Sequence, residues 1–186
     1  MEQTLVLSSR SLAGRRAVAV ALGAALVAAA AQVAIPLPGT PVPMTLQPLA
    51  VLVVGGLLGP SLGAASLLLY LALGAAGLPV FTPLGLPGIA RLVGPTGGYL
   101  LAYPVAAFAV GLLSRDGMRT LRVILGVVTG LVLIHLGGVA QLLLLTGDAG
   151  GAVRLGTLPF LLGDLGKVAI AVLVVRRAAA PMRARL

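Results

Sequence analysis

Two opposite charges lie three residues apart in the last apolar stretch of this chain. Asp164 and Lys167 are surrounded by the hydrophobic residues of segment 158–175. A charge at bilayer depth is energetically costly, so ionisable residues in membrane segments usually face a protein interior or a water-filled cavity. Spacing of i and i+3 places both side chains on one face of a helix, close enough to neutralise each other. The pair predicts either a polar clamp for a solute or a buried ion pair that only holds helices together.

A second polar pair stands where another apolar segment begins. Thr45 and Gln47 follow a proline-rich stretch that covers residues 36–45. Thr45 either caps the following helix or offers its hydroxyl to a ligand. Gln47 can both donate and accept hydrogen bonds, and it could bind a ligand or bond to a neighbouring helix.

A third group of candidates precedes the fourth apolar segment. Arg91 would suit a ligand that bears a carboxylate, or it is a solvated loop residue. Tyr99 ends the stretch Gly94-Pro-Thr-Gly-Gly-Tyr99 and offers a ring and a hydroxyl that could close over a ligand or pack at an interface. The stretch lacks the lysine and the spacing of a P-loop, so it does not predict nucleotide binding.

The remaining ionisable residues do not indicate an enzyme. His135 is the single histidine of the chain, and we expect it to make an interhelical hydrogen bond rather than to bind a metal. Asp148 and Arg154 are interpreted as loop charges. The sequence contains no nucleophile with an adjacent base, no catalytic carboxylate pair and no metal-ligand cluster. We therefore expect no catalytic residues, no metal and no cofactor.

The composition is that of a membrane protein. The chain has 186 residues, of which 59% are hydrophobic, with 13 Lys and Arg against 4 Asp and Glu. Its mean hydropathy is +1.14. These values indicate an all-α integral membrane protein. The net charge of +9 lies mostly at the ends of apolar segments, so it is interpreted as a membrane-orientation signal and not as a nucleic-acid-binding surface.

About six transmembrane helices are expected within a single membrane domain, residues 1–186. The apolar segments cover about residues 17–35, 46–58, 61–76, 97–113, 123–145 and 158–175. With the N-terminus inside, ten arginines fall on the cytoplasmic side, and only Arg91 and Arg154 fall outside. Because positive residues favour the cytoplasmic side, both termini are predicted to be cytoplasmic. The first segment is long for a signal peptide and is interpreted as an uncleaved helix.

Small residues mark one face of the first apolar segment. Ala17, Ala21 and Ala25 are spaced by four residues, and a stripe of this kind lets another helix approach closely. The partner is either another protein or another helix of the same chain.

Four sequence stretches together resemble one known family. They are IPLPGTPVPMTLQPLAVLVVGGLLGP (35–60), YLALGAAGLPVF (70–81), GPTGGYL (94–100) and PFLLGDLGK (159–167). Their order and spacing resemble the BioY family, the biotin-binding S components of prokaryotic energy-coupling-factor (ECF) transporters. The loop over residues 82–92 is less rich in glycine and richer in proline and leucine than this family would suggest.

The resemblance implies a multi-pass protein of the prokaryotic plasma membrane that binds biotin near its outer side. It also implies a transmembrane T component and ABC-type ATPases as partners. Asp164 and Lys167 would then help to hold biotin, and Ala17, Ala21 and Ala25 would resemble the surface offered to the T component. We expect the ureido ring at the charged pair, and the carboxylate nearer to Arg91, Tyr99 or the N–H groups of a helix start.

Two other functions remain open at this point. The chain could be a solitary or self-associating biotin carrier that works without ATPases. It could also be a structural membrane subunit, in contact with lipid and partner helices but without a ligand.

Overall fold

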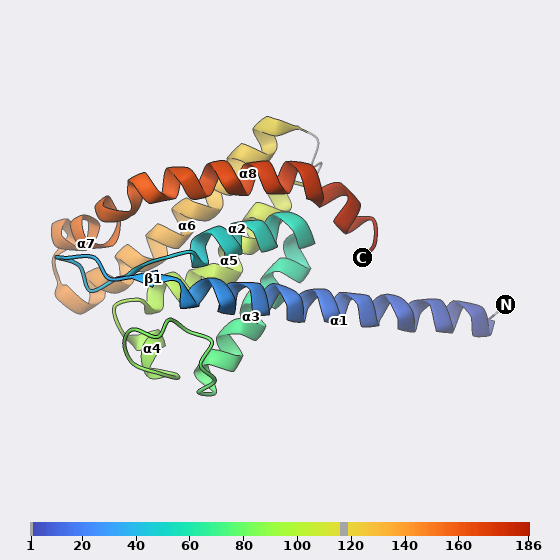
Figure 1. Cartoon of the computed structure of the whole chain (residues 1–186), viewed down its shortest axis with the longest axis horizontal. Coiled ribbons are helices and arrows are strands. Elements are labelled where there is room, and N and C mark those ends of the chain that lie inside the picture. Colours follow the sequence, from blue (N-terminus) through green and yellow to red (C-terminus); the bar gives the residue numbers. More distant parts are fainter. Residues whose placement is uncertain (1, 116–118) are drawn as a thin grey trace.

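The computed structural model describes residues 2–115 and 119–186 (Figure 1). Within these residues six long helices make up the body of the protein: α1 (Glu2–Gln32), α2 (Gln47–Leu58), α3 (Pro60–Ala75), α5 (Gly97–Leu113), α6 (Thr120–Thr146) and α8 (Leu161–Arg183). Shorter elements join them: strands β1 (Ala34–Ile35) and β2 (Met44–Thr45), helices α4 (Ala90–Val93) and α7 (Ala149–Gly156), and the 3-10 turn η1 (Leu158–Phe160). The predicted all-α membrane architecture with about six spans is confirmed.

The long helices differ in how far they can reach across a bilayer. Among the described residues, three segments are long and apolar enough to span it: Leu12–Gln32, Thr120–Thr146 and Ala149–Arg183. Helices α2, α3 and α5 have only 12, 16 and 17 residues, whereas a full span needs about 20. Figure 1 shows both termini at one end of the bundle, and the β1–β2 hairpin, α4 and α7 at the other end. The short connecting elements therefore gather on one side of the membrane helices.

Helix ends follow from glycine and proline. Gly59 has φ of +82°, which glycine adopts without a steric penalty, and Pro60 occupies the first turn of α3. Together they turn the chain sharply from α2 into α3. Gly147 has φ of +69° and ends α6 in a left-handed cap.

Glycine also allows the helices to approach closely. A Cβ atom on Gly98 of α5 would collide with the backbone carbonyl of Gly137 on α6. A Cβ atom on Gly55 of α2 would likewise meet the backbone of Ala107 on α5. Close backbone approach of this kind stabilises helix pairs in membranes through van der Waals contact. It fixes α5 between α2 and α6.

One arginine ties the helix ends on the side where the termini lie. The guanidinium of Arg183 donates to the backbone carbonyls of Gly56 and Leu57 at the end of α2, and of Ser114 and Arg115 after α5. The last carbonyls of a helix have no partner within the helix. Arg183 therefore satisfies two helix ends at once and fastens α8 to both.

The alanine stripe of α1 faces away from the bundle. Ala17, Ala21 and Ala25 are exposed, whereas Ala24 and Val27 are buried against the other helices. Within the described chain the stripe is therefore not used for packing. Its role in binding a partner stays a prediction.

Helix α1 is longer than the sequence predicted. The apolar pattern begins at residue 17, but the helix starts at Glu2. The preceding residues are polar or mixed and contain no proline, so nothing in them stops a helix from continuing.

Candidate functional site

A cavity is lined by the β1–β2 hairpin and by residues of α2, α5, α6 and α8. The space free of protein atoms among its lining residues, open solvent included, is about 570 Å³. Every residue that the sequence suggested as ligand-binding lines it: Thr45, Gln47, Arg91, Tyr99, Asp164 and Lys167. Residues separated by more than a hundred positions thus meet in one place, although their contact with a ligand stays a prediction.

The charged end of the cavity is built by α8 and α6. The Asp164 carboxylate accepts from Lys167 Nζ at 2.8 Å through Oδ1, and its Oδ2 lies 2.8 Å from His135 Nε2. The Asp164 and Lys167 side chains are 4% and 7% exposed. Both partners of the carboxylate shield it from the apolar surroundings, which explains how a charge is tolerated at this depth. The predicted i, i+3 pair and the interhelical hydrogen bond of His135 are confirmed.

The carbonyl oxygen of Gly156, at the end of α7, joins this group to α5. It accepts from the Tyr99 hydroxyl at 2.6 Å, and His135 Nδ1 lies 3.2 Å from it. The rings of Tyr99 and His135 meet edge to face, with centroids 6.3 Å apart. The sequence interpretation of Asp148 and Arg154 as loop charges is wrong for Arg154, which lies within α7, and Asp148 is the N-cap residue of that helix. The sequence did not predict this short helix, because eight residues are too few to show an apolar period.

Neutral polar side chains form the middle of the cavity. Gln47 Nε2 donates to the Tyr70 hydroxyl on α3 at 2.7 Å, and the Thr45 hydroxyl donates to Gln47 Oε1 at 3.2 Å. Gln47 therefore makes an interhelical bond and also lines the cavity. Thr45 is not the N-cap residue of α2, because that position is Leu46, which makes no side-chain cap bond. From its place in β2, the Thr45 hydroxyl nevertheless accepts the backbone N–H of Gln47, the first residue of the helix, at 3.3 Å.

Arg91 provides a positive charge from α4. It is 6% exposed, so the sequence alternative of a solvated loop residue is wrong. Its Nη2 donates to the Thr82 carbonyl at 2.8 Å, and its Nη1 donates to the Leu84 carbonyl. Burial lowers the pKa of Arg91 from its ordinary value, and an arginine guanidinium nevertheless keeps its proton in proteins. Its Nε–H is buried and has no hydrogen-bond partner among the described residues.

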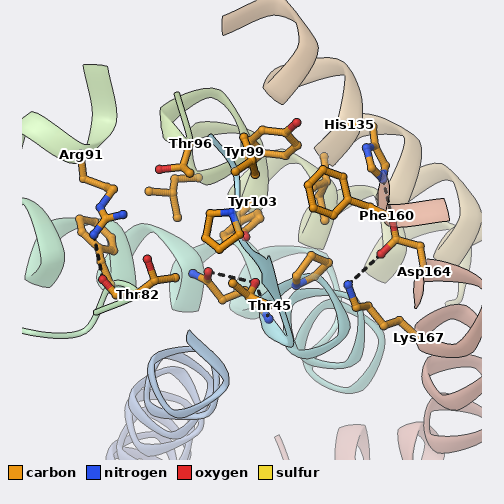
Figure 2. A pocket seen from close by; sticks show the side chains of 17 residues that line it. Thr45, Thr82, Arg91, Thr96, Tyr99, Tyr103, His135, Phe160, Asp164 and Lys167 are labelled. Atoms are coloured by element: carbon orange, nitrogen blue, oxygen red, sulfur yellow. Dashed lines mark hydrogen bonds and ion pairs between the residues drawn. The ribbon is translucent and has the colours of Figure 1, made fainter. Parts of the chain in front are cut away.

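The cavity therefore has two charged ends, with neutral polar and aromatic side chains between them. Figure 2 shows Arg91 and Thr82 at one end, and His135, Asp164 and Lys167 at the other. The rings of Tyr99, Tyr103 and Phe160 lie between them. Such a cavity suits an elongated molecule that carries hydrogen-bond donors and acceptors at one end, an apolar body, and an anionic group at the other end.

Sequence reasoning missed several lining residues. The sequence predicts an interhelical hydrogen bond for His135 but no place in the site, and it does not predict Tyr103 and Phe160 as lining residues. A signal existed for Tyr103, because Tyr99 and Tyr103 are four residues apart and share a face of α5 in a chain with 3 Tyr and 3 Phe. In the described parts of the chain, no group of three or more His, Cys, Asp or Glu side chains could hold a metal ion.

Comparisons with known proteins agree with this architecture. The BioY family model matches residues 2–184. A Pyrococcus horikoshii protein named "Probable biotin transporter BioY" is 42% identical over 158 residues, which are 85% of this chain and 92% of that protein. "Biotin transporter BioY" of Thermotoga maritima is 36% identical over 153 residues, 82% of this chain and 89% of that protein.

A solved structure is similar in three dimensions as well. The crystal structure of the S-component for biotin from an ECF-type ABC transporter has a TM-score of 0.80 and 29% sequence identity to this chain. The alignment covers 87% of this chain and 89% of that one. Since the family model extends over nearly the whole sequence, the chain belongs to the BioY family.

Proposed function

We propose that this chain is the biotin-binding S component of an ECF transporter in the prokaryotic plasma membrane. The observation that carries the proposal is the cavity with an ion pair at one end and Arg91 at the other. Membership of a family whose relatives are named biotin transporters supports the choice of ligand. Residues 1–186 act in this proposal as one membrane domain.

The ureido ring of biotin matches the ion pair. The ring carries two N–H donors and one carbonyl acceptor. The Asp164 carboxylate can accept one N–H, and the Lys167 ammonium can donate to the carbonyl, which gives two charge-assisted hydrogen bonds. Because the two side chains already lie 2.8 Å apart, the donor and the acceptor are arranged before the ligand arrives.

The carboxylate of biotin matches the other end of the cavity. Arg91 is buried with an unused Nε–H, and it lies in Figure 2 at the end opposite to Asp164. The thiophane ring and the valeryl chain would lie along Tyr99, Tyr103 and Phe160, which offer apolar ring surface. Thr45 of β2 and Gln47 of α2 complete the cavity wall, and their side chains can form hydrogen bonds with the ureido ring.

Energy for uptake comes from partners in this proposal. The sequence contains no P-loop, so ATP hydrolysis belongs to ABC-type ATPases that act through a T component. The exposed stripe of Ala17, Ala21 and Ala25 on α1 is the surface offered to the T component, and the remaining apolar helix faces contact lipid. The chain binds and releases biotin unchanged and is not an enzyme.

Calorimetric titration of the purified protein with biotin tests the ligand and the site together. We expect tight one-to-one binding that Asp164→Asn weakens strongly. Asp148→Asn is the matched control, because Asp148 is exposed at the N-cap of α7 and lies outside the cavity lining. Unchanged affinity in Asp164→Asn would move the polar clamp elsewhere. Absence of binding in folded protein would refute the biotin proposal and favour a structural subunit.

Transport without partners is the remaining alternative. Self-association of this chain as a solitary carrier would predict biotin uptake in cells that lack the T component and the ATPases. Loss of uptake on deleting these partners, with binding intact, supports the S-component function.

A further inference from the structure

A second hollow lies on the outside of the helix bundle, between α1, the end of α2 and the end of α8. We call it the α1 groove. Its apolar wall includes Val18, Leu22 and Leu26 of α1, Leu57 and Leu58 of α2, and Met182 of α8. The space free of protein atoms among its lining residues, open solvent included, is about 1640 Å³. It shares no lining residue with the cavity of Asp164 and Lys167, so it is a separate feature of the molecule.

The groove opens because α1 leaves the bundle toward its N-terminal half. A Cβ atom on Gly23 would lie 2.5 Å from Ser66 Oγ of α3, so the two helices are in contact there. A Cβ atom on Gly14, more than two turns earlier, would meet no atom within 4 Å. On the other side, the residues after α8 turn toward α1 (Figure 1), and Arg16 Nε donates to the main-chain oxygen of Leu186 at 2.7 Å. The groove is therefore bounded on both sides.

The apolar wall of the groove is not covered by the described chain. Val18, Leu22 and Leu26 are 59%, 65% and 47% exposed. All three belong to the segment Leu12–Gln32, which is long and apolar enough to span a membrane. The bilayer core contains hydrocarbon and no water, so an open apolar groove at this depth is filled by lipid chains or by another protein.

The length of the groove matches one leaflet of the bilayer. Along α1 it extends from Arg15 to Leu26, and the 11 residues between these positions correspond to about 16 Å of helix. Half of the hydrocarbon core of a bilayer is about 15 Å thick. With Arg15 at the membrane surface, Leu26 therefore lies near the middle of the bilayer, and the wall between them has the depth of one layer of acyl chains.

The polar end of the groove carries two arginines without an anionic partner. Arg15 and Arg185 both line this end and are exposed. In the described parts of the chain, neither guanidinium takes part in a hydrogen bond or an ion pair. The sequence has 4 Asp and Glu, and none of them lines the groove. A guanidinium binds phosphate through two parallel hydrogen bonds, and basic pockets at the ends of membrane helices bind anionic lipid head groups.

We propose that the α1 groove binds a single anionic phospholipid. Its phosphate lies between Arg15 and Arg185, and an acyl chain lies along Val18, Leu22 and Leu26. The inference does not depend on the ligand of the main cavity. A partner helix fits this wall less well, because close helix approach in membranes needs small residues and the wall carries valine and leucine. The alanine stripe occupies the neighbouring face of α1, one residue earlier at each position.

Native mass spectrometry of the full chain in neutral detergent tests the proposal. The probes are dioleoyl phosphatidylglycerol and dioleoyl phosphatidylcholine, which have the same acyl chains and differ in net charge. We expect one retained phosphatidylglycerol per chain and much weaker retention of phosphatidylcholine. The double variant Arg15→Gln with Arg185→Gln should weaken phosphatidylglycerol binding by roughly 20- to 30-fold, because each arginine near a membrane surface contributes about fivefold to the affinity for anionic lipid.

A matched control has the same change in net charge. Arg176→Gln with Arg177→Gln also removes two positive charges, and both residues are exposed on α8 outside the groove lining. We expect this control to bind phosphatidylglycerol nearly as well as the unchanged chain. Equal losses in the two double variants would overturn the proposal, because the lipid would then respond only to overall charge. Equal retention of the two lipids by the unchanged chain would overturn it as well.

A further variant tests the apolar part of the groove without a change in charge. Leu22→Trp places a larger side chain in the groove, and Leu22 is 65% exposed, so the substitution removes no buried packing. Thermal unfolding without added lipid checks that the variant is folded. We expect loss of retained phosphatidylglycerol. Unchanged retention would overturn the acyl-chain site, and unchanged retention with loss of a co-purifying membrane protein would identify the groove as a protein interface instead.

The biotin titration separates this inference from the proposed function. Arg15→Gln with Arg185→Gln should bind biotin as the unchanged chain does, because neither residue lines the main cavity. Phosphatidylglycerol retention in a chain that binds no biotin would support the groove and refute the proposed function. Biotin binding without selective lipid retention would do the reverse.

Discussion

The buried ion pair allows stability and ligand binding to be tested separately. Lys167→Met removes the ammonium but keeps an apolar stem of similar length, so Asp164 stays buried with His135 as its remaining partner. Removal of one member of a buried pair usually destabilises a protein by about 3–5 kcal/mol, because it leaves a charge without compensation. Since His135 still contacts Oδ2 at 2.8 Å, we expect a value near the lower limit, roughly 3 kcal/mol.

The double variant Asp164→Asn with Lys167→Met is the control for this effect. It removes both charges, so no buried charge is left without compensation. We therefore expect the double variant to be more stable than Lys167→Met alone. Affinity should behave differently, because both variants lose charge-assisted hydrogen bonds to biotin, each worth about 1.5–3 kcal/mol, or roughly ten- to a hundredfold in the dissociation constant.

Thermal unfolding of biotin-free protein in detergent and calorimetric titration would measure the two quantities. The reasoning predicts that stability is recovered in the double variant while affinity is not. If Lys167→Met unfolds at the same temperature as the unchanged chain, the contribution of the buried ion pair to stability is refuted. Biotin bound equally tightly by the double variant would refute its role in ligand binding.

Three further predictions concern residues on other helices. Arg91→Gln should weaken biotin binding by roughly ten- to a hundredfold. The affinity for an uncharged biotin amide should stay nearly unchanged, because only the carboxylate needs the guanidinium. Equal losses of affinity for both ligands would contradict this prediction. Ala21→Leu should abolish biotin uptake in cells, because the larger side chain would keep a partner helix from approaching α1 closely. Biotin binding by the purified chain should be kept, because Ala21 is exposed on α1. Normal uptake would show that the alanine stripe is not a partner surface. Arg183→Ala should lower the free energy of unfolding by roughly 2 kcal/mol, because the hydrogen bonds to the ends of α2 and α5 are lost, and biotin affinity should stay the same. Chemical unfolding would measure this effect, with Arg185→Ala as the control. Equal stability of the two variants would argue against the role of Arg183 in fastening the helix ends.

Much of the fold could be predicted because membrane helices leave a strong signal. Runs of apolar residues locate α5 and α6 to within a few residues, and Gly147 marks the end of α6. The hairpin, α4 and α7 could not be found in this way. They are too short to show a period, and they are held in place by contacts with distant residues, such as the bond from Thr40 Oγ1 to the Leu155 carbonyl at 2.8 Å.

The candidate site, like the fold, could be predicted from the sequence only in part. Asp164 and Lys167 could be paired from sequence, because a helix brings residues at i and i+3 together whatever the rest of the chain does. The burial of Arg91 could not, because it depends on carbonyl groups of the loop that folds over it. His135 also needed the structure, since its partners lie on α8 and at the end of α7.

The sequence by itself therefore determined the membrane environment, the helices and the local charge pair. These follow from the cost of burying polar backbone and charge in lipid and from helix geometry, which both act over a few residues. The tertiary structure decided which distant side chains share the cavity. His135 and Asp164 are 29 residues apart in the chain, and they meet only because α6 and α8 pack side by side.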